Sequence, residues 1–271
     1  MARFLVFEKH LEGLDLLIPV VEDLLGERGH HVINYHQLET AEFVSFTERE
    51  GKPLMEGPAS NFSFTDMKDL KVIESNVLQL VFGADAFHEA LNPLMETYRP
   101  SFLMIGPFGD LKSKTNFLSA EMKPLLRQVS CPIFFSGEVY EKMKFKRIVF
   151  ASDLSSADQE NFRELLDLVQ WQDKTLDLLT IDTAQYFTQP DVVMREVIKD
   201  MAAEARMHEV STHFKEDSSV QKGVLSFLDE HEADLLVMCN HSHKKLKHNL
   251  WGNALEDIVH KAPVPMLIIN D

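Results

Sequence analysis

Thiol and imidazole side chains gather in one short segment, Cys239-Asn240-His241-Ser242-His243, with His248 close behind. Thiolates and imidazoles are ligands that zinc accepts, so a metal site is one interpretation of this segment. The two histidines alternate in a stretch expected to be a loop, however, and spacing fixes neither a second cysteine pair nor an acidic ligand. We therefore predict no metal site here.

A carboxylate stands beside two hydroxyl groups at Asp153, Ser155 and Ser156. These residues could supply a base and a nucleophile. They also directly precede an apolar pattern with helical spacing, where Ser and Asp side chains commonly cap the first turn. The chain contains no Gly-x-Ser-x-Gly elbow, no His-Glu-x-x-His helix and no Walker loop. We favour the capping role and predict that the protein is not an enzyme.

The elements that would position these residues alternate between strand and helix patterns throughout 145–271. An apolar run at 147–152 has strand length, and Phe162, Leu165 and Val169 then recur at helical spacing. Strands separated by helices must run parallel. The predicted fold is an open, doubly wound, Rossmann-like α/β sheet of five strands. Its further strands are expected at 176–181, 209–214, 235–238 and 266–269, and its further helices at 190–207, from 218 onward and at 250–261.

The chain also repeats itself. Leu118 corresponds to Trp251 and Leu126 to Val259, at a constant separation of 133 positions through the end of each half. This periodicity predicts two domains of one fold, at 1–138 and 145–271, joined by a short linker. The first copy is longer in its middle, and we expect a loop-rich insertion at about 40–70. This expectation of an insertion is supported by four helix-breaking residues, namely Gly51, Pro53, Gly57 and Pro58.

Three segments of the second copy, 147–155, 234–242 and 262–269, resemble the first strand, the phosphate-binding loop and the closing strand of universal stress proteins. The resemblance covers 145–271 and, more weakly, 2–38 and 75–136. It implies a stress-response protein of two fused domains, each with a ligand crevice at the carboxyl ends of its strands. It also implies an intrachain pseudo-dimer that pairs Ile133–Phe135 with Met266–Ile269.

Members of this family that bind ATP resemble one another in a Gly-2x-Gly-9x-Gly-Ser/Thr signature. Glycines let backbone N–H groups approach the phosphates, and a helix N-terminus favours the anion. The second copy departs from the signature, because Cys239, Ser242, Gly252 and Asn253 occupy its positions. The resemblance implies that Asp153 contacts the nucleoside and that Ile181 flanks adenine. The phosphates would lie against Asn240, His241, Ser242, Gly252 and Asn253.

The first copy departs further from the signature. Its positions are occupied by Gly106, Gly109, Ser119 and Ala120, and Glu8 or Lys9 replaces the aspartate. Lys112 and Lys114 could supply charge in place of lost backbone donors. We therefore predict a non-enzymatic regulatory or protective protein with degenerate ATP-binding loops and no certain cofactor. The alternative is a switch that binds ATP or AMP at the second site, and a third hypothesis is an apolar ligand or protein client.

Composition limits the partners and the compartment. The formal net charge is -16, and each half of the chain carries -8. Such an acidic chain is not expected to bind nucleic acid or an anionic membrane through its general field. The sequence has 2 cysteines, no signal peptide pattern and no apolar stretch of membrane-spanning length. We predict a cytoplasmic protein, which could also form a homo-oligomer.

Overall fold

The computed structural model describes most of the second half of the chain and shorter stretches of the first. The described residues are 3–8, 20, 23–25, 31–37, 77–82, 95–96, 99–105, 126, 128–136, 144–183, 191–206, 209–241 and 250–270. Two compact units make up the chain. Unit 1 comprises Met1–Ile18 and Arg28–Val139, and unit 2 comprises Pro19–Glu27 and Tyr140–Asp271. The two units are defined by the contacts within them. The domains 1–138 and 145–271 were predicted from the sequence repeat, and their boundaries remain a prediction. The expected insertion at 40–70 lies outside the described residues.

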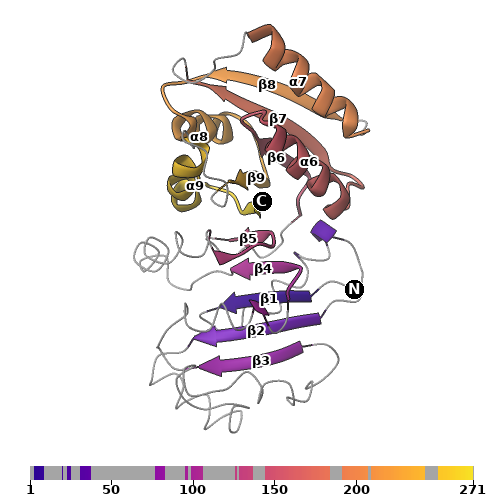
Figure 1. Cartoon of the computed structure of the whole chain (residues 1–271), viewed down its shortest axis with the longest axis vertical. Helices are drawn as coiled ribbons and strands as arrows, with labels where there is room; N and C mark the ends of the chain where they lie inside the picture. Colours follow the sequence, from indigo (N-terminus) through magenta and orange to yellow (C-terminus); the bar gives the residue numbers. More distant parts are fainter. Residues whose placement is uncertain are drawn as a thin grey trace. The chain divides into compact units, whose positions relative to one another are not determined.

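Unit 2 alternates strictly between strands and helices, as its sequence pattern predicts (Figure 1). All four neighbouring strand pairs are parallel, and the strand order is β8-β7-β6-β9-β10. The strands are β6 (Arg147–Ala151), β7 (Thr175–Asp182), β8 (Val210–Glu216), β9 (Leu235–Asn240) and β10 (Met266–Asn270). The helices are α6 (Ser156–Leu168), α7 (Asp191–Glu204), α8 (Val220–Glu230) and α9 (Leu250–Lys261).

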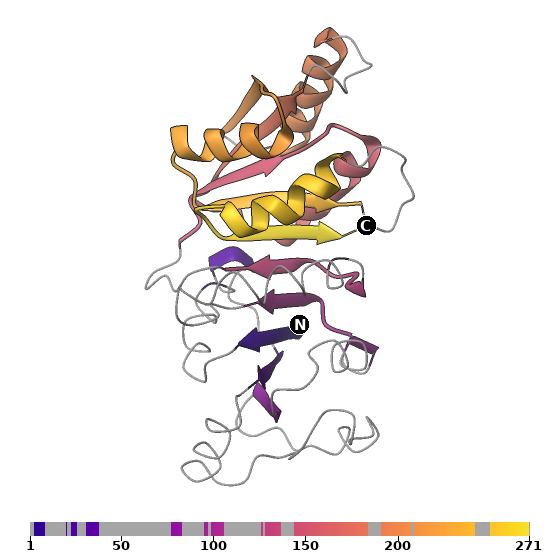
Figure 2. The same ribbon diagram turned by 90° about the vertical axis from the view of Figure 1, so that its left-hand side faces the viewer.

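Helices cover both faces of this sheet, with α6 and α7 on one side and α8 and α9 on the other (Figures 1 and 2). This arrangement explains why β9 and β10 are buried along their whole length, whereas the edge strand β8 has no fully buried residue. Parallel strands covered on both faces require continuous apolar runs, and Leu235–Met238 and Met266–Ile269 provide them.

Serine caps begin two of the helices. The Ser155 hydroxyl accepts a hydrogen bond from the Asp158 N–H and caps α6, and the Ser219 hydroxyl accepts one from the Lys222 N–H and caps α8. The predicted capping function of the residues after the first strand is therefore confirmed for Ser155. Ser156, the other serine considered, is the first residue of α6 and is exposed.

The described residues of unit 1 form five strands, whose neighbours are again all parallel. Their order is β3-β2-β1-β4-β5, which repeats the connectivity of unit 2 strand for strand. The predicted fold class, open parallel five-stranded sheets of Rossmann-like type, is therefore confirmed. The strands are β1 (Arg3–Glu8), β2 (His31–Gln37), β3 (Val77–Phe82), β4 (Phe102–Ile105) and β5 (Ile133–Phe135).

Residues 19–27 belong to unit 2, although they come from the first tenth of the chain. Asp23 accepts a hydrogen bond from the Phe145 N–H at 3.0 Å, and its carboxylate lies 3.1 Å from Nζ of Lys174. Val20 and Leu24 are each only 2% exposed. The segment therefore contributes both apolar packing and a partly buried ion pair to unit 2, which the sequence did not predict.

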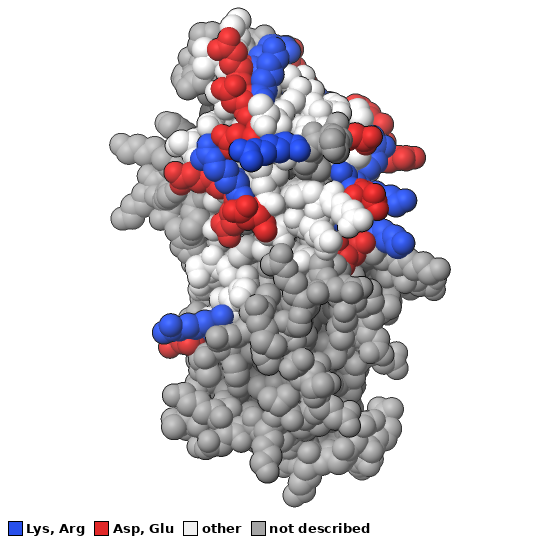
Figure 3. Space-filling view, turned by 90° about the vertical axis from the view of Figure 1, so that its right-hand side faces the viewer, with Lys and Arg blue, Asp and Glu red and all other residues white. Residues whose placement is uncertain are grey.

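Charges of both signs are mixed on the surface. On the face shown in Figure 3, the described Lys and Arg side chains lie among Asp and Glu side chains. Arg163 and Glu204 illustrate the mixing with two hydrogen bonds of 2.8 Å between their exposed side chains. Among the described helices, none combines the length and the hydropathy that a bilayer-spanning segment needs.

Candidate functional site

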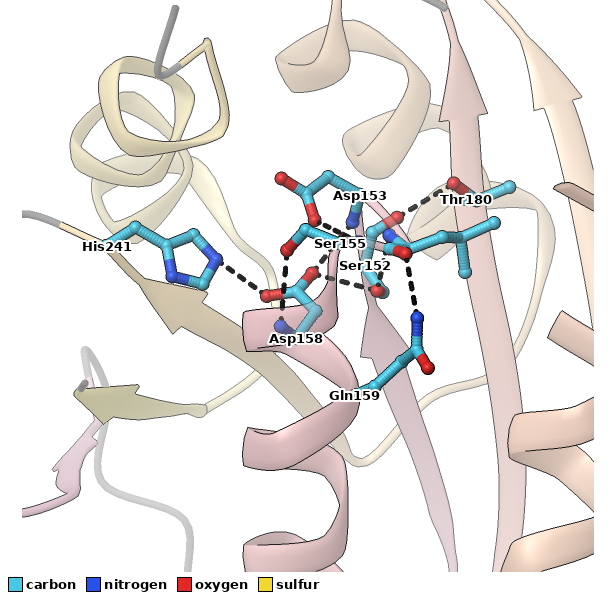
Figure 4. Close-up of polar contacts among 8 residues, drawn as sticks. Ser152, Asp153, Ser155, Asp158, Gln159, Thr180 and His241 are labelled. Atoms are coloured by element: carbon cyan, nitrogen blue, oxygen red, sulfur yellow. Dashed lines mark hydrogen bonds and ion pairs between the residues drawn. The ribbon is translucent and has the colours of Figure 1, made fainter. Parts of the chain in front are cut away.

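Polar side chains of unit 2 meet where three of its strands end. Ser152 and Asp153 follow β6, Thr180 stands near the end of β7, and His241 follows β9. The carboxyl ends of parallel strands share one edge of a sheet, so these residues come together although they are far apart in sequence (Figure 4). In open α/β sheets this edge is where ligands bind. We call this group, together with Asp158 of α6, the edge cluster.

Asp158 lies at the centre of the edge cluster and is 2% exposed. Its Oδ1 lies 2.7 Å from Nε2 of His241, and its Oδ2 accepts hydrogen bonds of 2.8 Å from the Ser152 hydroxyl and the Asp153 N–H. Both oxygens of the carboxylate therefore have partners, as a buried carboxylate requires. Since an ionised carboxylate only accepts hydrogen bonds, Nε2 of His241 carries the hydrogen.

The turn between β6 and α6 is strained. Leu154 has a φ of 61°, a left-handed conformation that a Leu side chain disfavours. Its N–H donates to the Ser152 hydroxyl at 2.9 Å, and its carbonyl accepts from the Gln159 side chain at 3.2 Å. The Thr180 hydroxyl donates to the Ser152 carbonyl at 2.8 Å. Side chains of the cluster and its neighbours thus hold the turn in this conformation.

The two carboxylates of the cluster differ in their electrostatic environment. For Asp158, burial acts to raise the pKa, but the hydrogen bond and charge of His241, with the Ser152 and Asp153 donors, outweigh burial and lower it. For Asp153, burial and the negative charge of Asp158 together raise the pKa to about 6. The donors around Asp158 therefore favour its ionised form, whereas burial and the neighbouring carboxylate oppose the ionisation of Asp153.

The structure brings together two of the predicted site residues, Asp153 and His241, through Asp158. Ile181 is 1% exposed and lies against Gly223 of α8. Cys239 and Asn240 are also buried, and the Asn240 amide donates to Oδ1 of Asn270 at 2.7 Å. Of the predicted residues whose side chains are described, only Asp153 is more than slightly exposed.

The remaining predictions concern residues whose side chains or whole placement lie outside the described part of the chain. Gly252 and Asn253 fall in the first turn of α9, and Glu8 is the last residue of β1. Outside the described residues lie Lys9, Gly106, Gly109, Lys112, Lys114, Ser119, Ala120, Ser242, His243 and His248. What the sequence predicts for these residues, phosphate contacts and the absence of a metal site among them, remains a prediction.

Sequence reasoning missed Asp158, the central residue of the cluster. The segment Ser155-Ser156-Ala157-Asp158 has the Ser-x-x-acid spacing of a capping box, a signal that could have singled it out. The observed geometry is half of that motif, because Ser155 accepts from the Asp158 N–H while the Asp158 carboxylate turns toward His241. Its contact with a histidine 83 positions away has no local signal.

The hydroxyl groups of Ser152, in the edge cluster, and of the nearby Ser155 both form hydrogen bonds within the protein. Ser152 donates its hydroxyl hydrogen to Asp158, and Ser155 accepts from the first turn of α6. A serine nucleophile would instead pass that hydrogen to a base such as an imidazole. The described contacts of these two serines therefore stabilise a turn and a helix.

The parallel strand order, the helices on both faces and the polar edge define a doubly wound, Rossmann-like α/β protein. More specifically, residues 144–270 match the model of the universal stress protein family, and this part of the chain belongs to that family. Membership indicates a role in the stress response. The predicted resemblance to this family is thereby confirmed for 145–271.

Solved structures resemble the chain over nearly its whole length. A functionally unknown protein from Pseudomonas aeruginosa has a TM-score of 0.66 and 14% identity, over 100% of this chain and 92% of its own. A universal stress protein from Archaeoglobus fulgidus has a TM-score of 0.58 and 16% identity, over 98% of this chain and 96% of its own. At these identities the similarity concerns the fold alone. No curated protein matches the sequence.

Proposed function

We propose that the chain is a non-enzymatic regulatory or protective protein of the stress response, with degenerate nucleotide-binding loops. The observation that carries this proposal is the internal pairing of the edge cluster. Asp158 binds His241, Ser152 and the Asp153 N–H at distances of 2.7 to 2.8 Å. A site organised for turnover needs groups that can exchange protons with a substrate. Here those groups are buried and bonded to one another.

The exposure of the residues supports the same conclusion. His241 is 3% exposed and Ser152 is 2% exposed. A substrate could reach either residue only after the cluster had opened, which would break the hydrogen bonds that hold the β6–α6 turn. The proposed function needs no such opening, because it requires only a stable fold and a surface for recognition.

Turnover can be tested directly with Mg-ATP. The full-length protein is incubated with the nucleotide, and released phosphate is measured beside a protein-free blank and a Ser152→Ala variant. We expect release at the rate of the blank. Release clearly above the blank would overturn the proposal, and its loss in the Ser152→Ala variant would assign the activity to the edge cluster.

The second proposed function is a switch that binds ATP or AMP at unit 2. One observation favours it, namely that Asp153 is the partly exposed member of the edge cluster and stands where open α/β sheets bind ligands. In universal stress proteins that bind ATP, the equivalent aspartate is expected to contact the nucleoside. The switch would therefore depend on the Asp153 side chain.

Thermal unfolding distinguishes the two functions. A nucleotide present at 100 times its Kd adds about 2.7 kcal/mol to the free energy of unfolding, which raises Tm by several degrees. The switch predicts such a shift with millimolar ATP or AMP, its loss in Asp153→Ala, and its retention in the matched control Asp229→Ala on the exposed face of α8. An unchanged Tm in the wild-type protein would contradict the switch and leave the first proposal standing.

The proposals about location and assembly rest on the sequence. They are a cytoplasmic location, pairing of the two halves through their last strands, a further homo-oligomer and a protein client. The acidic composition, with 43 Asp and Glu residues against 27 Lys and Arg, supports the proposal that the partners are neither nucleic acid nor anionic membrane. Sedimentation of the purified chain would measure its oligomeric state.

A further inference from the structure

Three side chains that can bind metal converge at the edge cluster from separate segments. Asp153 precedes α6, Asp158 lies in its first turn, and His241 follows β9. One potential ligand atom from each residue lies within 4.8 Å of the other two. The imidazole comes from a segment 83 positions away from Asp158, so the convergence is a product of the tertiary fold and not of one acidic stretch.

The geometry of the buried pair is close to what coordination requires. Oδ1 of Asp158 and Nε2 of His241 are 2.7 Å apart. Two adjacent ligands of a cation with bonds of about 2.1 Å lie roughly 3.0 Å apart in an octahedral site. The two atoms would have to separate by only a few tenths of an ångström for a cation to replace the hydrogen between them.

Other contacts hold the two carboxylates in place without using all of their capacity to bind. Oδ2 of Asp158 is fixed by the Ser152 hydroxyl and the Asp153 N–H, while Oδ1 of Asp153 accepts from the Ser155 N–H at 2.8 Å. Hydrogen bonds of this kind orient the ligands of metal sites in proteins. Both acids are therefore anchored, with one potential ligand atom of each within 4.8 Å of the other.

The balance of charge in the cluster also favours the binding of a cation. Two largely buried carboxylates face a single imidazole, and the negative charge of Asp158 opposes the ionisation of Asp153. A divalent cation would compensate both carboxylates at once, which one imidazolium does not. Carboxylates suit Mg²⁺ and Mn²⁺, and the added imidazole favours a transition metal such as Mn²⁺ or Zn²⁺.

We propose that Asp153, Asp158 and His241 form a binding site for one divalent transition-metal cation. The cation binds one oxygen of each carboxylate and Nε2 of the imidazole. The hydrogen on Nε2 is released to solvent or moves to Nδ1, so that the bound imidazole is neutral. This site is independent of the proposed function, because it requires neither a nucleotide nor turnover.

The test uses the full-length protein, which is first freed of metal with a chelator that is then removed. The probe is Mn²⁺ or Zn²⁺, added without nucleotide. Calorimetric titration measures Kd and stoichiometry for the wild-type protein, for Asp153→Asn and for the matched control Asp229→Asn. Asp153→Asn removes one ligand while leaving both partners of the Asp158–His241 pair in place. We expect one saturable site in the wild-type and control proteins, weakened about tenfold or more in Asp153→Asn.

A second measurement keeps the proposal falsifiable if calorimetry gives little heat. Saturating Mn²⁺ should raise the Tm of the wild-type and control proteins clearly more than that of Asp153→Asn. Equal binding by all three proteins would place the cation elsewhere and overturn the proposal. A wild-type protein that binds neither cation at millimolar concentration would also overturn it and would identify the Asp158–His241 pair as purely structural.

Discussion

Asp158 and His241 form a buried pair in which Oδ1 and Nε2 are 2.7 Å apart, and each side chain is 3% exposed. The pair joins the first turn of α6 to the residue that follows β9. It therefore fixes the starting point of the segment that the family resemblance identifies as the phosphate loop. A buried charge pair of this kind contributes to the geometry of a site as much as to its stability.

Removing one partner of this pair should destabilise unit 2 strongly. His241→Ala leaves the Asp158 carboxylate buried without its main compensating charge, and we expect a loss of about 3 kcal/mol or more. Urea denaturation followed by far-UV circular dichroism measures the change. The Asp158→Asn/His241→Ala double variant should lose less than the sum of the two single losses, because the groups interact. Additive losses would contradict the pairing.

The cap of α6 gives a smaller and more specific prediction. Ser155→Ala removes the hydroxyl that accepts the Asp158 N–H at 3.2 Å, and we expect a loss of about 1 kcal/mol in the free energy of unfolding. Ser156→Ala is the matched control, because Ser156 is exposed and already helical, and it should change stability little. If the two variants lose the same amount in urea denaturation, Ser155 is not the cap.

The strands and helices of unit 2 could be predicted because they depend on local patterns. The helix expected at 190–207 is α7 (Asp191–Glu204), and the strand expected at 176–181 is β7 (Thr175–Asp182). Apolar spacing and the serine cap mark these elements in any window of the sequence. Their ends differ by a few residues, since the ends of helices and strands depend on contacts outside the segment.

The site was predicted only in part, for a physical reason. Asp153 and His241 were identified through the resemblance of 147–155 and 234–242 to universal stress proteins, which places both residues at the carboxyl ends of strands. Asp158 was missed because an acid in the first turn of a helix is usually exposed and favourable to the helix dipole. Only the tertiary contact with His241 buries it. Ile181 was expected to flank a ligand, which remains a prediction. In the structure its side chain packs against Gly223, in the space that a Cβ atom would need.

The raised pKa of Asp153 predicts a pH dependence of stability. The pKa is about 6 in the folded protein against 3.8 for the free group, mainly because of burial and then because of Asp158. Between these values the folded state binds more protons than the unfolded state, so this carboxyl destabilises the fold progressively as pH rises from about 4 to 6. Its contribution is on the order of 3 kcal/mol.

Asp158 acts in the opposite direction, since its lowered pKa contributes stability that is lost as pH falls. The contribution of Asp153 is therefore obtained from the difference in unfolding free energy between Asp153→Asn and the wild-type protein at each pH. Urea denaturation from pH 4 to pH 7 in the presence of a chelator should show Asp153→Asn gaining stability relative to the wild-type protein as pH rises. A constant difference between the two proteins across that range would contradict the raised pKa.

Both cysteines should react slowly. Burial raises the pKa of Cys131 to about 12, and burial together with the charge of Asp158 raises that of Cys239 well above its usual value. Since the thiolate is the reactive form, the reactive fraction of Cys131 at neutral pH is about a thousandfold smaller than for a thiol of pKa 9. Iodoacetamide labelling followed by mass spectrometry should be slow in the native protein and fast in urea. Rapid native labelling of Cys131 would contradict its raised pKa.

The contact between Gly223 and Ile181 predicts a coupled pair of substitutions. A Cβ added at Gly223 would lie 2.6 Å from Cγ2 and 2.8 Å from Cδ1 of Ile181, distances at which atoms must move. Ile181 is 1% exposed between β7 and α8 and has little room to shift. Gly223→Ala should therefore cost about 1–3 kcal/mol, although alanine favours a helix more than glycine does.

Ile181→Ala removes the atoms that the new methyl group would meet, at the cost of a cavity. In the Gly223→Ala/Ile181→Ala double variant, the methyl group partly fills that space, so the combined loss of stability should be smaller than the sum of the two single losses. Thermal and urea unfolding of the four proteins complete the cycle. If Gly223→Ala is as stable as the wild-type protein or more stable, then Ile181 is not held against α8.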